Sequence, residues 1–323
     1  KAGLFRQIGA QIKMSRQVRH RVDLAVCVGD VYLLTLAGLF LKRPLFFLPT
    51  AKSDYIAPHL GIEIRIMRRF CRQIFPRDAR TAASLSQQGL PAEFVGNLMM
   101  DCLPFKNPAA FQEKDGWVIL LLPGSREEAY ANMKDLTATV VALEKLASGQ
   151  GIKEKRRYFV ALAGGLNFNE LSKTLGPDGW VGAEPGTGEV EEGVCGHLGR
   201  VDAEGNLQIT IVQGRFADLL AASDLVIGLA GTGNEQAAGL GKPVLTFPGR
   251  GAQFTKVFAE RQKRLLGDAV SLLAREPELV ARTALTLLRN PAARERMGQC
   301  GRERMGAPGG ARKLALRIKE YLA

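Results

Sequence analysis

The segment from Ser223 to Phe247, SDLVIGLAGTGNEQAAGLGKPVLTF, has the residue pattern best suited to binding an anion. An apolar run that predicts a strand leads into Gly231, Thr232 and Gly233, and we expect a helix to begin near Asn234. Glycines allow a ligand to approach the backbone, and unpaired N–H groups at a helix start attract phosphate, as does the helix dipole. The segment therefore predicts a phosphate or pyrophosphate site. The structural alternative is a tight turn in which Thr232 or Asn234 caps the helix.

Gly124, Ser125 and Arg126 form a second candidate site shortly after the buried-strand pattern WVILLL. A guanidinium group at this position would neutralise the charge of a diphosphate and stabilise it as a leaving group. The alternative is a solvated arginine that pairs with Glu127 or Asp135 on the predicted helix that follows.

Asp30 stands between the apolar runs Leu24 to Gly29 and Val31 to Leu41, which predict a strand and a helix. Ligands of open α/β sheets bind at the carboxyl ends of the strands, so Asp30 is a candidate general base. Asp is also a common N-cap residue, and capping of the following helix is the structural alternative.

Three segments of the chain resemble one family of enzymes. GTGNEQAAGLGKPVL resembles the donor-binding loop of UDP-sugar enzymes with the GT-B fold, which include the non-hydrolysing UDP-N-acetylglucosamine 2-epimerases and lipid-A-disaccharide synthase. LLPGSREEA and VGDVYLLTLAG resemble lipid-A-disaccharide synthase more specifically, and the second contains Asp30 where that family has an essential aspartate. The resemblance implies an α/β protein of the GT-B fold, with two Rossmann-like domains facing a cleft and the nucleotide sugar held by the C-terminal domain.

The resemblance also implies roles for individual residues. Gly231, Thr232 and Gly233 would face the diphosphate. The family's ribose-binding glutamate falls on Gln236, with Glu235 one place earlier. A carboxylate accepts hydrogen bonds from two ribose hydroxyls, whereas an amide offers one acceptor and two donors, so both residues are candidates for the ribose.

Contacts to the two ends of the donor follow from the same comparison. Gln253, in the segment GRGAQFT, occupies the place where many GT-B enzymes contact the donor sugar. Gly164, after a predicted strand, would let the backbone approach the uracil, with a simple turn as the alternative. Asp30 would take the proton from an acceptor hydroxyl during a single-step inversion at the anomeric carbon.

Element patterns predict two α/β layers in tandem. We place an N-terminal, acceptor-side domain at residues 1–105, a UDP-sugar-binding domain at 106–305, and a C-terminal helix at 306–323 that packs back toward the N-terminal domain. Residues 64–74, with four arginines among Ile, Met and Phe, predict a basic amphipathic helix suited to an anionic membrane face or a lipid acceptor, with half-buried arginines on an ordinary helix as the alternative. Residues 176–207 are glycine-rich and are expected to be irregular. The first domain lacks the opening strand of a GT-B fold, so Lys1 is expected to mark a truncated or incompletely represented N-terminus.

Composition and charge narrow the classes of molecule that the chain is expected to bind. The 323 residues are 46% hydrophobic and carry a formal net charge of +12. Residues 1–105 hold 15 Lys and Arg against 7 Asp and Glu, which favours an anionic lipid or membrane surface over nucleic acid as the partner. No apolar stretch is long enough to span a bilayer. The five scattered cysteines indicate neither a disulfide framework nor a zinc site, so we expect a cytoplasmic protein, and the basic first third suits a peripheral position on the cytoplasmic face of the membrane. We expect no cofactor and no metal, since no DxD motif follows a predicted strand.

These observations together predict a metal-independent, inverting glycosyltransferase that moves a hexosaminyl-type sugar from a UDP donor to a lipid-linked or amphipathic acceptor. The alternative is a non-hydrolysing UDP-N-acetylglucosamine 2-epimerase, which shares the donor loop. A basic nucleic-acid-binding protein ranks below both, because no recognisable nucleic-acid-binding motif accompanies the charge.

Overall fold

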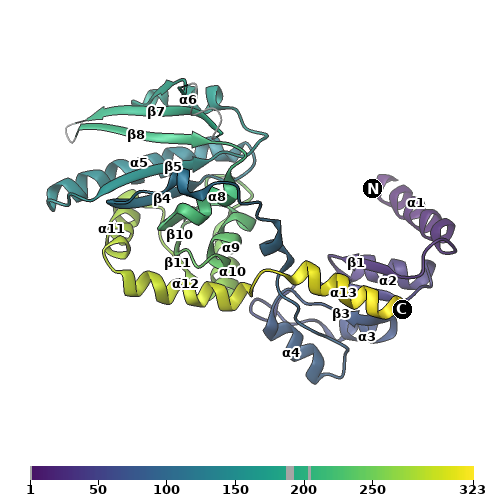
Figure 1. Cartoon of the computed structure of the whole chain (residues 1–323). Coiled ribbons are helices and arrows are strands. Elements are labelled where there is room, and N and C mark those ends of the chain that lie inside the picture. Colours follow the sequence, from purple (N-terminus) through teal and green to yellow (C-terminus); the bar gives the residue numbers. More distant parts are fainter. Residues whose placement is uncertain (1, 187–192, 203–204) are drawn as a thin grey trace. The chain divides into compact units, whose positions relative to one another are not determined.

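The computed structural model describes residues 2–186, 193–202 and 205–323, and it divides the chain into two compact units (Figure 1). Unit 1 comprises Lys1–Asp101 and Met305–Ala323, and unit 2 comprises Cys102–Arg304. The chain therefore begins and ends in the same unit, and unit 2 is one uninterrupted stretch of sequence.

Asp218 forms hydrogen bonds with residues that precede the first strand of unit 2. Its Oδ1 accepts hydrogen bonds from the backbone N–H groups of Lys106, at 2.7 Å, and Asn107, at 3.1 Å, while Arg215 donates to its Oδ2 at 2.6 Å. Burial alone would raise the pKa of Asp218, but these donors outweigh burial and lower it. These bonds hold Lys106 and Asn107 against unit 2.

Unit 1 is built on a parallel sheet whose described strands have the order β1-β2-β3. Helices α2 and α3 pack on one face of the sheet, and α13 covers Phe46 and Leu48 of β2 on the other. Val26 and Val28 of β1, which pair with these two residues in register, remain 39% and 53% exposed. The elements of unit 1 are α1 (Ala2–Val18), β1 (Ala25–Val28), α2 (Val31–Phe40), β2 (Leu45–Leu48), α3 (Gly61–Phe70), β3 (Cys71–Ile74), α4 (Ala79–Gln87), the 3-10 turn η1 (Leu98–Cys102) at the boundary, and α13 (Gly310–Leu322).

Unit 2 has the strand order of a doubly wound fold. Within the described residues its sheet runs β11-β10-β9-β4-β5-β8-β7-β6, and only β7 and β6 are antiparallel to their neighbours. From β4 and β5 the chain continues to β6 at the edge of the sheet and comes back through β7 to β8, which pairs with β5. It then crosses to the other side of β4 and forms β9, β10 and β11. The reversal lies between β4 and β9, and ligands of such sheets bind outside the carboxyl ends of the strands at this point.

The elements of unit 2, in chain order, are η2 (Pro108–Phe111), β4 (Gly116–Leu122), α5 (Glu128–Gly149), β5 (Lys155–Ala161), α6 (Phe168–Leu175), η3 (Gly176–Asp178), β6 (Val181–Ala183), β7 (Val194–Asp202), β8 (Gly205–Val212), α8 (Phe216–Ala222), β9 (Leu225–Gly228), α9 (Gly231–Gly239), β10 (Val244–Thr246), α10 (Lys256–Leu266), η4 (Gly267–Ala269), β11 (Val270–Leu272), α11 (Pro277–Leu288) and α12 (Pro291–Met305).

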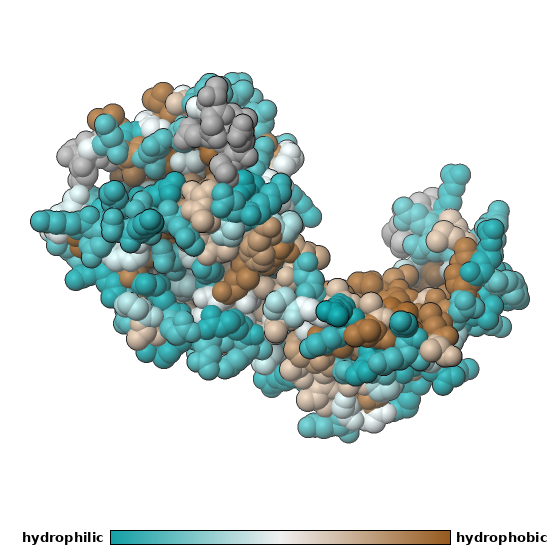
Figure 2. Space-filling model, viewed as in Figure 1, coloured by the Kyte–Doolittle hydropathy of each residue, from teal (hydrophilic) through white to brown (hydrophobic). Residues whose placement is uncertain are grey.

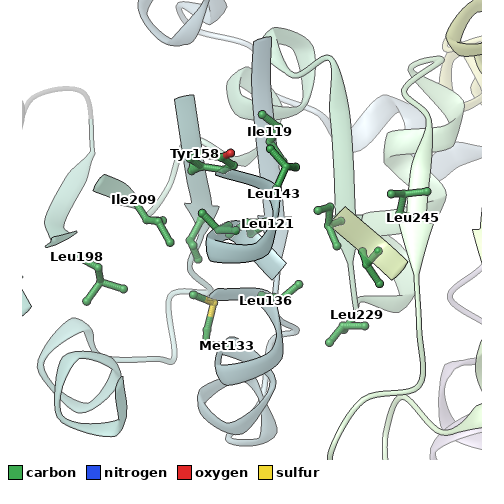
Figure 3. Close-up of a cluster of buried hydrophobic side chains, with 14 of the residues drawn as sticks. Ile119, Leu121, Met133, Leu136, Leu143, Tyr158, Leu198, Ile209, Leu229 and Leu245 are labelled. Carbon is green, nitrogen blue, oxygen red and sulfur yellow. The ribbon is translucent and has the colours of Figure 1, made fainter. Parts of the chain in front are cut away.

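The central strand β4 is buried on both faces, as expected for a parallel sheet covered by helices. Ile119 and Leu121 point into a cluster that also contains Met133 and Leu136 of α5 (Figure 3). Every one of these four side chains is fully buried. This cluster sets the position of α5 on the sheet, and α5 carries residues that shape the candidate site.

Two sequence-based expectations about elements are wrong. Residues 64–74 are not one helix, because α3 ends at Phe70 and β3 follows without a loop. Residues 176–207 are not irregular throughout, since they contain β6, β7 and the start of β8. Glycine content alone suggested a loop, but antiparallel pairing of the consecutive strands β7 and β8 overrides that preference. Residues 187–192 and 203–204 of this stretch lie outside the described residues.

Among the described residues, no helix is both long and apolar enough to cross a bilayer. Apolar side chains do remain exposed on unit 1, where brown surface is visible in Figure 2.

Candidate functional site

A cavity of about 450 Å³ opens in unit 2 where β4 and β9 end. This volume lies within the usual range for sites that bind small molecules. Its lining comes from the loop after β4, the start of α9 and the loop after β10, with further side chains from α5, α8 and α10. The cavity therefore lies at the reversal point of the sheet.

The start of α9 forms one side of the cavity. The helix begins at Gly231, earlier than the predicted start near Asn234, so that Gly231, Thr232 and Gly233 form its first turn and line the cavity. The N-cap residue is Ala230, which has no side-chain acceptor for the first-turn N–H groups, and the first turn contains no acidic residue. The N–H groups and the positive end of the helix dipole thus remain available to an anion.

Asn234 does not line the cavity. Its side chain is fully buried, and its Nδ2 donates to the carbonyl oxygen of Gly228 at 3.0 Å and to Oε1 of Gln262 at 2.8 Å. Thr246 Oγ1 donates to the same carbonyl of Gly228 at 2.7 Å. Asn234 therefore joins α9 to the end of β9 instead of facing a ligand, and Gln262, which the sequence did not single out, is its partner.

Gly124, Ser125 and Arg126 also line the cavity, in the loop between β4 and α5. Gly124 has a φ of +110°, a backbone conformation that favours glycine. Both Ser125 and Arg126 are exposed. Among the charged side chains that line the described cavity, Arg126 is the cation and Glu128 is the carboxylate.

The loop after β10, residues 248–254, supplies Gly251, Gln253 and Phe254 to the cavity wall. Gln253 is exposed and thus accessible to a ligand. The carboxylate of Asp135 on α5 receives two hydrogen bonds from the guanidinium group of Arg250, each 2.7 Å long. The hydrogen bonds to Asp135 raise the pKa of Arg250.

The remaining residues predicted for the nucleotide divide into two groups. Gln236 lines the cavity and is 7% exposed, whereas neither Glu235 nor Gly164 lines it. Of the segment around Gly164, the cavity includes the residues before it, Ala161, Leu162 and Ala163. The geometry therefore favours Gln236 over Glu235 as the α9 side chain that a ligand would meet.

Asp30 acts as the N-cap of α2. Its Oδ1 accepts hydrogen bonds from the backbone N–H groups of Tyr32, at 3.0 Å, and Leu33, at 3.4 Å. This is the structural alternative that the sequence left open for Asp30, and it gives the side chain a defined role within unit 1.

Several cavity residues carry no recognisable signal in the sequence. Asn132 and Glu128 lie on α5, where polar residues are normally read as the solvent face of an amphipathic helix. The aromatic residues Phe216 and Phe258 stand at positions of α8 and α10 that suit ordinary core packing. These four residues can be recognised as part of the site only from the folded structure, which places them around the cavity at the ends of β4 and β9.

Unit 1 holds a separate cluster of titratable groups in the region that follows β2. The Oε2 atom of Glu63 accepts hydrogen bonds from Lys52 Nζ, at 2.7 Å, and from the backbone N–H of Leu60, at 2.8 Å. His59 Nδ1 lies 3.3 Å from the same oxygen, and the His59 side chain is only 3% exposed. Burial lowers the pKa of His59 and outweighs the opposing effect of the neighbouring carboxylate.

No family model and no curated protein sequence matches the chain. Several solved structures, however, are similar to it. The UDP-GlcNAc 2-epimerase from Neisseria meningitidis bound to UDP-GlcNAc is 15% identical, with a TM-score of 0.59 over 97% of this chain and 80% of that one. The UDP-GlcNAc 2-epimerase from Methanocaldococcus jannaschii is 15% identical, with a TM-score of 0.57 over 98% and 82%. MurG from Acinetobacter baumannii is 16% identical, with a TM-score of 0.57 over 98% and 78%.

The chain has the GT-B fold. Its α/β architecture with two Rossmann-like domains, predicted from the sequence, is confirmed by these similarities, which at such identities concern the fold alone. None of the structures compared above is a lipid-A-disaccharide synthase, so the finer resemblance remains a prediction from the sequence.

The predicted transfer of a sugar to a lipid-linked acceptor is wrong. Most of the first similar structures are UDP-N-acetylglucosamine 2-epimerases, which favours the alternative function. The physical reason for the error is that the LPGSR match covers only the loop between β4 and α5. The sequence predicts a diphosphate contact for this loop, and a diphosphate is common to all nucleoside diphosphate sugars, so the match does not distinguish one of their reactions from another.

Proposed function

We propose that the chain binds a UDP-N-acetylhexosamine in the cavity of unit 2 and interconverts UDP-N-acetylglucosamine with its 2-epimer. The observation that carries the proposal is the start of α9, which has no side-chain cap and lies at the reversal point of the sheet, with Arg126 lining the same cavity. In the proposed complex the diphosphate accepts hydrogen bonds from the N–H groups of Gly231, Thr232 and Gly233, and Arg126 neutralises part of its charge.

Gln236 and Gln253 complete the proposed site. Gln236 is nearly buried in the wall and offers one acceptor and two donors to the ribose, and Gln253 offers an amide to the sugar. Epimerisation at C2 breaks the C2–H bond, and because C2 has no neighbouring carbonyl carbon to accept the electron pair, this pair forms a C1–C2 double bond while the C1–O bond to UDP breaks. A proton then returns to the opposite face of C2 as UDP adds again to C1. The proposed reaction consumes no second substrate and requires neither a metal nor a redox cofactor.

Incubation with UDP-N-acetylglucosamine alone in deuterated buffer tests the activity. Proton NMR should show the manno epimer appearing, together with exchange of the C2 proton for deuterium, and chelation with EDTA should leave the rate unchanged. Calorimetric titration with UDP tests binding separately. Tight UDP binding without any exchange at C2 would overturn the epimerase proposal while retaining the nucleotide site.

A further inference from the structure

The loop of residues 248–254, which we call the Arg250 loop, joins β10 to α10 and lacks regular secondary structure. Gly251, Gln253 and Phe254 of this loop line the cavity. Within the loop, the backbone N–H of Gly249 donates to the carbonyl oxygen of Phe254 at 2.8 Å. A loop of this kind loses conformational entropy when a ligand orders it, so any contact that orders it beforehand favours binding.

Two residues on one face of α5 hold the Arg250 loop. The Oδ1 atom of Asn132 accepts a hydrogen bond from the backbone N–H of Arg250 at 2.7 Å. One turn further along the helix, both carboxylate oxygens of Asp135 accept hydrogen bonds from the guanidinium group of Arg250, each at 2.7 Å. The paired geometry fixes the direction of the arginine as well as its distance.

The same face of α5 also holds the loop after β4. Asn132 Nδ2 donates to the carbonyl oxygen of Pro123 at 2.9 Å, so a single buried amide connects both loops that line the cavity. The Arg250 loop lies close against the first turn of α5, since a Cβ atom on Gly251 would come within 2.0 Å of Cγ of Glu128. The spacing between the loop and α5 therefore has little tolerance.

The Asp135–Arg250 pair has more exposure than a core interaction would have. The side chain of Arg250 is 43% exposed, whereas that of Asp135 is 10% exposed. Half-exposed ion pairs usually add little to global stability. Both partners nevertheless connect directly to elements that line the cavity, which indicates that the pair serves the site.

We propose that Asp135 and Arg250 are positioning residues that hold the Arg250 loop in its ligand-binding conformation, so that Gln253 meets the sugar of a UDP-N-acetylhexosamine. The inference rests on the proposed function. It assigns the pair to recognition of the sugar, whereas recognition of the diphosphate belongs to the start of α9 and Arg126.

Asp135→Asn tests the assignment because it removes the charge and keeps the side-chain volume. A matched control is available on the same helix, since Glu144 accepts hydrogen bonds from Arg156 Nε, at 2.7 Å, and Nη2, at 2.9 Å, and Glu144 does not line the cavity. For Asp135→Asn we expect the affinity for UDP-N-acetylglucosamine to fall about tenfold and the affinity for UDP to change less than about twofold. For Glu144→Gln we expect both affinities to stay at the wild-type values.

Trypsin cleavage after Arg250 gives a second readout that does not depend on ligand. Asp135→Asn should accelerate this cleavage, and Glu144→Gln should not. Arg250→Lys keeps the cleavage site and the charge but loses the paired geometry, so it should also lose affinity for the sugar nucleotide. The inference is overturned if Asp135→Asn matches Glu144→Gln in both the ratio of the two affinities and the cleavage rate.

Failure of the proposed function has a different signature. If only the epimerase activity fails, the wild-type protein binds UDP without exchange at C2, and the ratio of the two affinities in the variants still tests the pair. If the nucleotide site fails as well, the wild-type protein binds neither UDP nor UDP-N-acetylglucosamine, which overturns the role of the pair in sugar recognition. The cleavage rates of the two variants then still report whether Asp135 orders the loop. The two failures are therefore distinguishable.

Discussion

Nδ2 of Asn234 on α9 donates a hydrogen bond to Oε1 of Gln262 on α10 over 2.8 Å, and the two residues are 0% and 2% exposed. Gln262 in turn donates from Nε2 to the carbonyl oxygen of Gly231 at 2.9 Å. A buried pair of amides, neither of which lines the cavity, thus fixes the position of the first turn of α9. We assign the diphosphate to this turn.

Asn234→Asp should destabilise the protein strongly. The change replaces a donor by an acceptor opposite the carbonyl oxygen of Gly228 and Oε1 of Gln262, so buried oxygens would face each other without a proton between them. We expect a loss of about 3 kcal/mol in the free energy of unfolding, measured by urea denaturation. The same substitution at Asn206, an exposed position of β8, is the control and should change little. Equal losses in both variants would contradict the role given to Asn234.

Arg126→Ala should weaken UDP binding and leave stability nearly unchanged. Arg126 is exposed at the cavity, and a charge-assisted hydrogen bond is worth about 1.5–3 kcal/mol, which corresponds to a loss of roughly 10- to 100-fold in affinity. Calorimetric titration measures the loss, and Arg126→Lys should restore part of it. Arg275→Ala, at an exposed position in the loop after β11, serves as the control and should bind UDP like the wild type.

Two glycines that the sequence proposes for the site should respond differently to alanine. Gly124 has a φ of +110°, so Gly124→Ala should cost about 1–3 kcal/mol in stability and displace the neighbouring Arg126. A Cβ atom on Gly164 would meet no other atom within 4 Å, and Gly164 does not line the cavity. Gly164→Ala should therefore leave both the melting temperature and UDP binding unchanged. A loss of UDP affinity in Gly164→Ala would restore the predicted uracil contact.

Acidification should destabilise unit 1 through His59 and Glu63. Burial lowers the pKa of His59 below 6.5, and the bonds from Lys52 and Leu60 outweigh burial to lower the pKa of Glu63 below 4.5. Each folded group binds fewer protons than its unfolded counterpart in the window between its two pKa values, so the free energy of unfolding falls as the pH falls. The contribution of His59 is complete above pH 6.5 and declines below it, and that of Glu63 declines below pH 4.5.

Thermal unfolding between about pH 7.5 and about pH 5 measures the contribution of His59. His59→Gln should flatten the decline over this range, whereas His20→Gln, at an exposed position after α1, should retain it. Identical pH profiles for His59→Gln and the wild type would contradict the lowered pKa of His59.

The GT-B fold follows from local sequence because the strands of unit 2 are short, continuous apolar runs, as in WVILLL of β4, and because turn residues separate them from helices. The start of α9 does not follow in the same way. Glycine disfavours a helix interior, so local propensity places the helix start near Asn234, whereas hydrogen bonds from Gln262 to the carbonyl oxygens of Ala230 and Gly231 help to hold the first turn in place.

Prediction of the candidate site was limited for a similar reason. Gly231 and Arg126 were identifiable because glycine-rich turns and arginines near helix starts suit anions. Asn132 and Asp135 could not be identified as site residues from the sequence, since they act through hydrogen bonds with Pro123 and Arg250, and Arg250 lies far away in the chain. The reaction itself was also beyond reach. Gly231 and Arg126 are predicted to contact a diphosphate, which transferases and epimerases would bind alike, and the candidate base Asp30 caps α2.

The return of α13 to unit 1 has a consequence for the order in which the protein can fold. Leu314 of α13 packs with Phe46 and Leu48 of β2, so these two side chains are not covered until α13, which follows unit 2 in the sequence, has been synthesised. Unit 2 has all of its own strands before that point. On the ribosome, unit 2 can thus complete its native core before the α13 side of the unit 1 sheet is covered.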